Sequence, residues 1–240
     1  IFFMKKVLNI LKLLVFAKLC IFTITFSTST LALSSDWVIN EKSKVRIISS
    51  KTATDNKNEI ILGLEYALDP GWKTYWKSPG GGGFPQKLVW NNSSNIEDIK
   101  IDWPVPIEFE ILGLKSLGYE NKVIFPITLK LKNKNKDINL VLNTNYLVCK
   151  DICIPGNANL YLEIPSGKAE FTKYLYELEK TKSSLPIENI NISPLYELKT
   201  QVTKKLNQIE ISVTGNSNKS FIDTNIFIHT PFGLPVINPI

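Results

Sequence analysis

The chain has 240 residues, of which 44% are hydrophobic and 21% charged, a composition typical of a folded globular protein and not of a disordered or fibrous one. Its formal net charge is +6, but four lysines and no acidic residue lie within residues 1–18, so the remainder carries only +2. Since Arg46 is the only arginine, the composition gives little support for a nucleic-acid partner.

The sequence predicts a signal peptide over residues 1–35. From Met4, two lysines precede an apolar run over 7–26, and small residues follow it. This order of charged, apolar and small segments is typical of secretory signals. Lys12 and Lys18 interrupt the apolar run and argue against a stable membrane span, although an uncleaved anchor is the alternative. Export implies an oxidising compartment, in which a cysteine pair is normally a disulfide.

The segment that follows is predicted to consist of strands and turns. Residues 44–50 and 59–67 are rich in β-branched and apolar side chains and enclose a polar loop at 52–58. Residues 123–131 alternate with period two, so one set of side chains faces a core. Pro126 cannot donate to a ladder, which predicts an edge strand or a bulge at that point.

Alternation continues from Asp137 to Val148, and residues 160–164 are predicted as the return strand. Cys149 has the opposite parity to Val148, so it is expected on the other face of its strand. Short strands separated by frequent turns, without helices between them, predict a mainly β protein with a β-sandwich fold.

The character of the sequence changes at Ser166. Phe171, Leu175 and Leu178 lie at helical spacing within 168–180, which predicts a helix. Three further strands are predicted, at 196–202, 209–214 and 221–229. We therefore expect a signal peptide at 1–35, a sandwich domain at 36–165, a linker helix at 166–185 and a second β unit at 186–240. The last unit is expected to be truncated, because the chain ends in mid-pattern.

Cys149 and Cys153 are the candidate site for chemistry. Residues four apart along a straight strand lie about 13 Å from each other, whereas a disulfide needs Cα atoms within about 4.4–6.8 Å. If the two sulfurs bond, residues 150–152 must therefore fold back as a tight turn. So short a loop contributes only about 2 kcal/mol through chain entropy, which favours an exchanging disulfide. The spacing alone leaves a structural disulfide equally open.

Other ligand classes find less support in the sequence. Two thiolates suit Cu(I), but no methionine or histidine lies near the cysteines, and the zinc-binding pairs of ligands are missing from the sequence. Trp72, Tyr75 and Trp76 are predicted to fill a sandwich core, with a stacking platform for a sugar or peptide as the alternative. We predict no metal, no cofactor and no small-molecule substrate.

Four motifs together resemble the amino-terminal periplasmic domain of DsbD-type thiol:disulfide interchange proteins, and especially that of ScsB-like copper-tolerance proteins. They occur in the family's order within residues 37–165. The motifs are Gly71-Trp-Lys-Thr-Tyr-Trp-Lys-Ser-Pro-Gly80 with Phe84-Pro85, Ile101-Asp-Trp-Pro-Val-Pro106, Gly118-Tyr-Glu with Val123-Ile-Phe-Pro126, and Leu147-Val-Cys-Lys-Asp-Ile-Cys-Ile-Pro155.

The resemblance implies an immunoglobulin-like sandwich whose cysteine pair, Cys149 and Cys153, passes electrons between a membrane-embedded thiol reductase and periplasmic thiol proteins. It also implies that a partner attacks the sulfur of Cys153. Residues 107–117 correspond to the loop that caps the disulfide in this family. Glu108, Phe109 and the nearby Tyr119 are the candidate cap residues, and Phe109 and Tyr119 have core positions as their alternative.

The sequence also departs from the family pattern. The founding members have a C-x5-C spacing, whereas C-x3-C resembles the ScsB-like branch. The membrane carrier and thioredoxin-like domain of the family are not found in these 240 residues, so the electron source is left open. Two other functions are considered: a binding or scaffold domain with a structural disulfide, and a copper-tolerance accessory protein that binds Cu(I).

Overall fold

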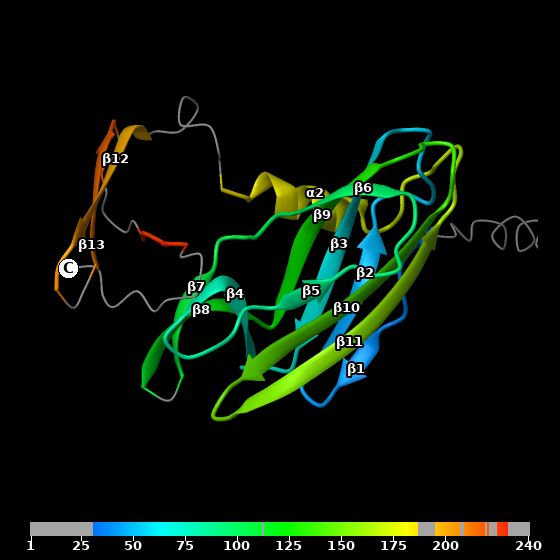
Figure 1. Ribbon diagram of the computed structural model, residues 1–240. Helices are drawn as coiled ribbons and strands as arrows, with labels where there is room; N and C mark the ends of the chain where they lie inside the picture. The colour runs from blue at the N-terminus through cyan, green and yellow to red at the C-terminus, as the bar shows by residue number, and fades with distance from the viewer. Residues whose placement is uncertain are drawn as a thin grey trace, which may run out of the picture. The chain divides into compact units, whose positions relative to one another are not determined.

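Most of the chain forms two β-sheets that pack face to face, as Figure 1 shows. The computed structural model describes residues 31–111, 113–186, 195–206, 209–218, 220 and 225–229. The first sheet has the order β1-β2-β3-β9-β6, with bounds Val38–Asn40, Ser43–Ser49, Glu59–Leu68, Lys122–Leu131 and Ile96–Ile101. The second has the order β11-β10-β4-β8-β7, with bounds Cys153–Ile164, Ile138–Cys149, Lys73–Gly80, Leu114–Glu120 and Ile107–Ile111. A short strand, β5 (Lys87–Val89), pairs with β10.

The core lies between the two sheets and is built from alternate residues of each strand. The predicted inward face of β10 is buried along its whole length: Ile138, Leu140, Leu142, Thr144, Tyr146 and Val148. Leu160, Leu162 and Ile164 of β11 are buried beside it. Trp72 and Trp76 also belong to this core, which confirms their predicted role. The prediction of an immunoglobulin-like β-sandwich is confirmed.

The predicted position of the strand around Pro126 is wrong. This strand, β9, is internal, with β3 on one side and β6 on the other, and its register with β3 continues through Pro126 without a bulge. The carbonyl of Pro126 accepts a hydrogen bond from the amide of Asp102. Because a strand residue directs its N and C=O to the same side, the proline nitrogen faces the region just beyond Ile101, the last residue of β6. The ladder with β6 ends there, so the missing N–H is tolerated.

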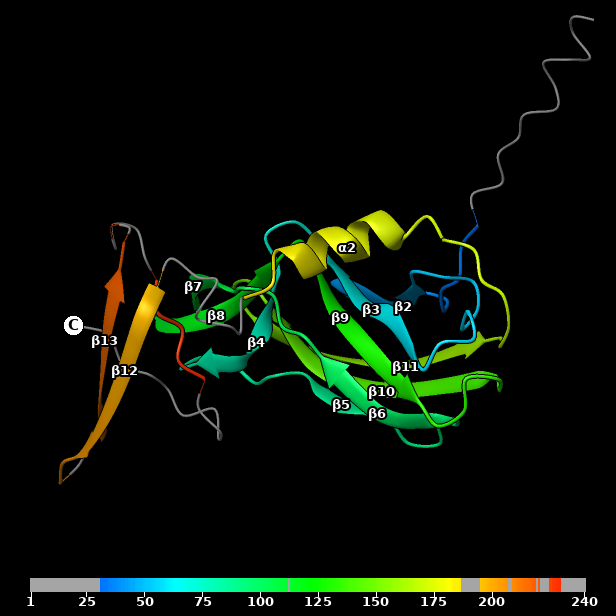
Figure 2. The ribbon, with the colours of Figure 1, turned by 90° about the horizontal axis from the view of Figure 1, so that it is seen from above.

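The outer face of the first sheet is covered by the helix α2, Leu175–Ser183 (Figure 2). Leu178 is fully buried there and packs with Ile48, Ile124 and the preceding Tyr174. The helix is shorter than the sequence predicts, because residues 168–174 are not helical. Phe171, which was assigned to the helix, instead forms an isolated bridge with Lys51 and is exposed.

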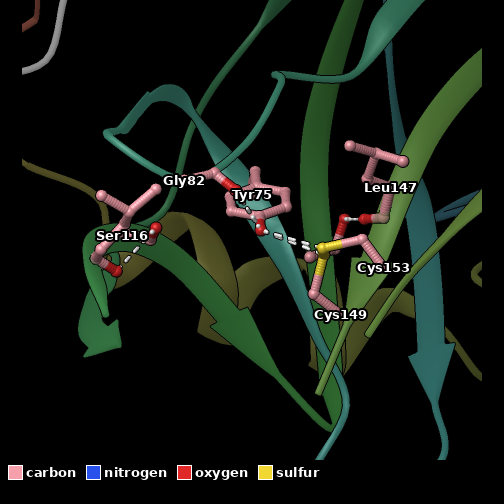
Figure 3. The surroundings of a disulfide bond; sticks show 8 residues. Tyr75, Gly82, Ser116, Leu147, Cys149 and Cys153 are labelled. Atoms are coloured by element: carbon pink, nitrogen blue, oxygen red, sulfur yellow. Dashed lines mark hydrogen bonds between the residues drawn. A yellow bond between two sulfur atoms is a disulfide. The ribbon is translucent and has the colours of Figure 1, made fainter. Parts of the chain in front are cut away.

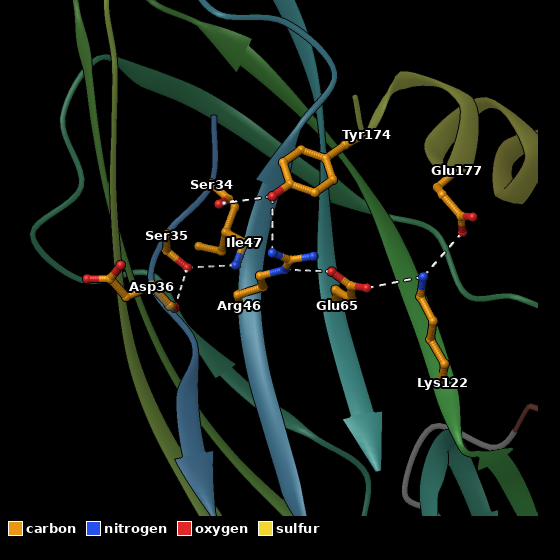
Figure 4. Close-up of polar contacts among 9 residues, drawn as sticks. All are labelled: Ser34, Ser35, Asp36, Arg46, Ile47, Glu65, Lys122, Tyr174 and Glu177. Atoms are coloured by element: carbon orange, nitrogen blue, oxygen red, sulfur yellow. Dashed lines mark hydrogen bonds and ion pairs between the residues drawn. The ribbon is translucent and has the colours of Figure 1, made fainter. Parts of the chain in front are cut away.

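A cluster of ion-paired and hydrogen-bonded side chains links helix α2 to the first sheet, as Figure 4 shows. The Glu65 carboxylate on β3 forms an ion pair with Arg46 at 2.7 Å and another with Lys122 at 3.2 Å. Arg46 also donates to the Tyr174 hydroxyl, and Lys122 pairs with Glu177 of α2 at 3.3 Å. The Glu65 side chain is only 6% exposed, and these partners offset the cost of burying its carboxylate.

Two more strands follow as predicted, β12 (Leu195–Lys204) and β13 (Ile209–Ser217), and they form an antiparallel pair. Residues 225–229 of the predicted third strand are not in a strand, and 221–224 lie outside the described residues. The domain boundaries drawn from the sequence stay predictions. The predicted signal peptide also falls almost wholly outside the described residues. Among the helices that the structure describes, none is long and apolar enough to span a bilayer.

Candidate functional site

The two cysteines close the hairpin between β10 and β11. The antiparallel register runs from Ile138 opposite Ile164 to Cys149 opposite Cys153, and residues 150–152 form the connecting turn. The sulfurs are bonded, and the two Cα atoms lie 4.1 Å apart. The tight turn that the spacing requires for a disulfide is therefore present.

The disulfide lies outside the sandwich core. Because Cys149 has the opposite parity to Val148, its side chain leaves the core face of β10, as the alternation predicts. Cys149 forms a small buried cluster with Tyr75 and Ile111, against which Phe109 and Leu147 pack. This arrangement places the sulfur chemistry near the surface without interrupting the core.

The two cysteines differ sharply in exposure. Cys149 is 0% exposed, whereas Cys153 is an exposed residue at the start of β11. A disulfide is broken by a thiolate that must reach one sulfur in line with the bond. Of the two cysteines, only Cys153 is exposed to solvent as a residue.

Tyr75 on β4 contributes a hydroxyl group beside the disulfide (Figure 3). The hydroxyl oxygen lies 3.0 Å from the Cys149 Sγ and 3.8 Å from the Cys153 Sγ. It also lies 2.9 Å from the carbonyl oxygen of Gly82, to which it donates a hydrogen bond. Burial of the side chain raises the pKa of Tyr75 above its ordinary value, so the hydroxyl remains protonated at neutral pH.

The segment predicted as a capping loop is a β-hairpin formed by β7 and β8. Phe109 of β7 packs against the disulfide cluster, with its ring centroid 5.8 Å from that of Tyr75. Glu108 points to solvent and forms an ion pair with Lys115 across the hairpin at 3.3 Å. Tyr119, in contrast, lies in the sandwich core, where it packs on Phe125 and donates to the carbonyl of Pro104. The hairpin brings Phe109 to the disulfide but directs Tyr119 away from it.

Charged side chains near the disulfide largely balance one another. Lys73 of β4 lies opposite Cys149 in the strand register, and its ammonium group is held by the Gly71 carbonyl and by Glu120. Lys150 and Asp151 are exposed in the turn and carry opposite charges. We therefore expect burial and hydrogen bonding, more than net charge, to distinguish the two sulfurs.

Gly118 of β8 allows the β7–β8 hairpin to pair closely with β4. A Cβ atom at Gly118 would lie 2.0 Å from the carbonyl oxygen of Thr74, a distance that the backbone cannot accommodate without moving. Gly118→Ala is therefore expected to separate β8 from β4, lower the free energy of unfolding by about 2 kcal/mol and expose the disulfide. Urea denaturation and the rate of reduction by dithiothreitol measure the two effects.

Gly113→Asn serves as the matched control within the same hairpin. Nothing lies within 4 Å of a Cβ at Gly113, and its positive φ is one that asparagine tolerates. We expect this variant to retain both the stability and the reduction rate of the parent. Unchanged reduction and unfolding of Gly118→Ala would contradict the close pairing of β8 with β4.

Residues 44–165, just over half of the chain, match the family model described as the N-terminal part of the thiol:disulfide interchange protein DsbD. The chain belongs to the DsbD N-terminal family. Among curated protein sequences, the comparison finds no match.

One solved structure shares the fold of this chain. The N-terminal periplasmic domain of ScsB from Proteus mirabilis superposes with a TM-score of 0.56 at 21% sequence identity, covering 78% of this chain and 87% of that one. The reduced N-terminal domain of DsbD from Neisseria meningitidis gives a TM-score of 0.29 at 10% identity, covering 51% and 88%. With the disulfide between Cys149 and Cys153, the family match identifies a thiol:disulfide exchange module.

Sequence reasoning missed the contact of Tyr75 with this disulfide. Tyr75 was grouped with Trp72 and Trp76 as a core residue, and it is indeed fully buried. However, it has the opposite parity to Trp76 on the same strand, so it faces the disulfide cluster and not the core. The parity of Tyr75 relative to Trp76 was the available signal.

Proposed function

We propose that this domain is a periplasmic thiol:disulfide carrier that passes electron pairs between a membrane-embedded thiol reductase and periplasmic thiol proteins. Cys149 and Cys153 are the redox pair of this proposal, and Cys153 is the sulfur that partners attack. The observation that carries it is the contrast between a buried Cys149 and an exposed Cys153 joined in one disulfide.

The electron transfer proceeds by two thiolate attacks. In the reduced domain, the Cys153 thiolate attacks a partner disulfide, forms a mixed disulfide and releases one partner thiolate. The Cys149 thiolate then attacks the sulfur of Cys153, which restores the domain disulfide and releases the second partner thiolate. Two electrons pass to the partner, and the reverse sequence with a reduced membrane partner regenerates the domain dithiol.

Phe109 and the β7–β8 hairpin are proposed to shield the disulfide until a partner docks. Phe109 packs on the cluster that contains Cys149, and Glu108 is exposed at the same hairpin, where it is available to a partner. We leave Tyr119 out of this role because its side chain belongs to the sandwich core.

A purely structural role for the disulfide is the competing function. It has little to stabilise here, because the ladder from Ile138 opposite Ile164 to Cys149 opposite Cys153 already holds β10 to β11. Closing so short a loop contributes about 2 kcal/mol through chain entropy. The arrangement therefore favours exchange.

The reduction potential of the Cys149–Cys153 pair tests the proposed function. We expect a value between about −180 and −270 mV, the range of working thiol carriers. The measurement equilibrates a Cys20→Ser chain in glutathione buffers and counts alkylated thiols, so that only the pair contributes. A potential below about −300 mV would place the bond among structural disulfides and overturn the proposal.

A further inference from the structure

The hydroxyl group of Tyr75 lies between two acceptors of different strength. Its oxygen is 2.9 Å from the Gly82 carbonyl oxygen and 3.0 Å from the Cys149 Sγ, and the side chain is 0% exposed (Figure 3). A phenol carries one proton and donates one hydrogen bond. The hydroxyl therefore donates its hydrogen bond to the stronger acceptor, and which acceptor is stronger depends on the redox state of Cys149.

In the oxidised domain the carbonyl is the better acceptor, because sulfur is only a weak one. When the disulfide is cleaved at Cys153, Cys149 departs as a thiolate, and a charged acceptor forms a hydrogen bond roughly twice as strong as a neutral one. Gly82 is only partly buried, so water can satisfy its carbonyl when the hydroxyl turns away. The exchange of partners leaves no buried polar group unsatisfied.

We propose that Tyr75 is a catalytic hydrogen-bond donor of this domain: its hydroxyl turns from the Gly82 carbonyl to Cys149 as that sulfur leaves. The inference rests on the proposed function. A partner thiolate bonds to Cys153 Sγ, the bond between the two domain sulfurs breaks, and Cys149 keeps the electron pair as a thiolate. No proton is transferred, because Tyr75 keeps its proton and donates only a hydrogen bond.

Packing around the tyrosine ring holds the hydroxyl in place before the reaction. A Cβ atom at Gly83 would lie 2.2 Å from the ring, so the glycine backbone lies directly against it. On another side, the ring contacts Phe109 of the β7–β8 hairpin. Because the oxygen already lies within hydrogen-bonding distance of the sulfur where charge develops, only the O–H bond has to rotate to stabilise that charge. Raised by burial, the pKa of Tyr75 keeps the donor protonated.

Tyr75→Phe removes the donor and retains the ring. In a Cys20→Ser, Cys153→Ser background, the ultraviolet absorbance of the thiolate reports the titration of Cys149 alone. We expect the pKa of Cys149 to rise by about one unit in Tyr75→Phe, a tenfold loss of thiolate at a given pH. With the cysteine pair intact, reduction by dithiothreitol is expected to slow about fivefold, because a leaving thiol of higher pKa leaves more slowly.

Tyr66→Phe is the matched control. It also removes a buried tyrosine hydroxyl, one that bonds to Thr144 Oγ1 at 2.9 Å in the sandwich core. We expect it to leave the Cys149 titration and the reduction rate unchanged. Lys73 and Lys150, the cations nearest the pair in sequence and register, are present in every variant, so their effects cancel.

A second variant separates hydrogen bonding from packing. Tyr75→3-fluorotyrosine makes the phenol a stronger donor at nearly the same size, so the pKa of Cys149 should fall, opposite to the effect of Tyr75→Phe. If neither variant shifts the titration while the unmodified domain exchanges at a carrier potential, Tyr75 has no such role and the proposed function stands. A structural potential in the unmodified domain would instead refute the proposed function itself.

Discussion

A variant that retains only Cys153 is expected to react with dipyridyl disulfide about 100-fold faster than a variant that retains only Cys149, since burial keeps the reagent away from a thiol and disfavours the thiolate that reacts. The variants are Cys149→Ser and Cys153→Ser, both in a Cys20→Ser chain. The difference follows from the exposure of the two residues, because Cys149 is fully buried under Tyr75 and Ile111 whereas Cys153 is exposed.

The same measurement in concentrated urea is the control. Unfolding removes the burial of Cys149, so the two variants should then react at similar rates. The chromophore released by dipyridyl disulfide gives both rates directly. Equal rates in the folded state, or a faster reaction of Cys149, would mean that Cys153 is not the sulfur that partners attack.

This asymmetry also sets how a partner would be captured. In Cys149→Ser, the mixed disulfide on Cys153 has no second domain thiol to resolve it, so the adduct should persist. In Cys153→Ser, the remaining sulfur is shielded by the β7–β8 hairpin, and few adducts should form. Under the proposed function, the packing of Phe109 and Ile111 against Cys149 thereby selects Cys153 for exchange.

The strands around the cysteines could be predicted because their signal is local. Period-two alternation identified the inward face of β10 and put Cys149 on the other face, and both are confirmed. Four-residue spacing required the turn at 150–152 once the sulfurs bond. Such arguments need only the geometry of one strand and one turn.

Contacts between residues that are far apart in the chain could not be predicted from the sequence. Tyr75 and Cys149 are 74 residues apart and meet because β4 pairs with β10, a register that no local pattern encodes. Phe109 and Tyr119 were equivalent candidates for the cap, yet their strands present them to opposite faces of the sheet. The prediction at Pro126 failed for the same reason, because whether β9 tolerates a proline at this position depends on where the neighbouring β6 ends.

Arg46→Met is expected to lower the free energy of unfolding by about 3 kcal/mol, the lower end of the cost of breaking a buried ion pair. The Glu65 carboxylate is 6% exposed and would keep only Lys122, whose own side chain is 47% exposed. Methionine retains most of the apolar stem of Arg46 but loses the guanidinium, which also stacks on the rings of Trp37 and Tyr174. Urea denaturation, followed by circular dichroism, measures the loss.

Two further variants isolate the buried charge as the cause. Lys130→Met removes the ion pair between Lys130 and Glu97, whose side chains are 50% and 51% exposed. It should lower the free energy of unfolding by less than about 1 kcal/mol. Arg46→Met with Glu65→Leu removes both charges and should recover most of the loss, because an apolar pair replaces a buried ionic one at little cost. A double variant as unstable as Arg46→Met alone would contradict this account.

The outcome also separates stability from sulfur chemistry. Arg46, Glu65 and α2 lie on the outer face of the first sheet, whereas the disulfide belongs to the second sheet. Under conditions in which the Arg46→Met chain remains folded, its Cys149–Cys153 pair should therefore keep the parent reduction potential and reactivity with dipyridyl disulfide. A shifted potential in this variant would mean that the ion pairs beneath α2 influence the sulfurs through the core.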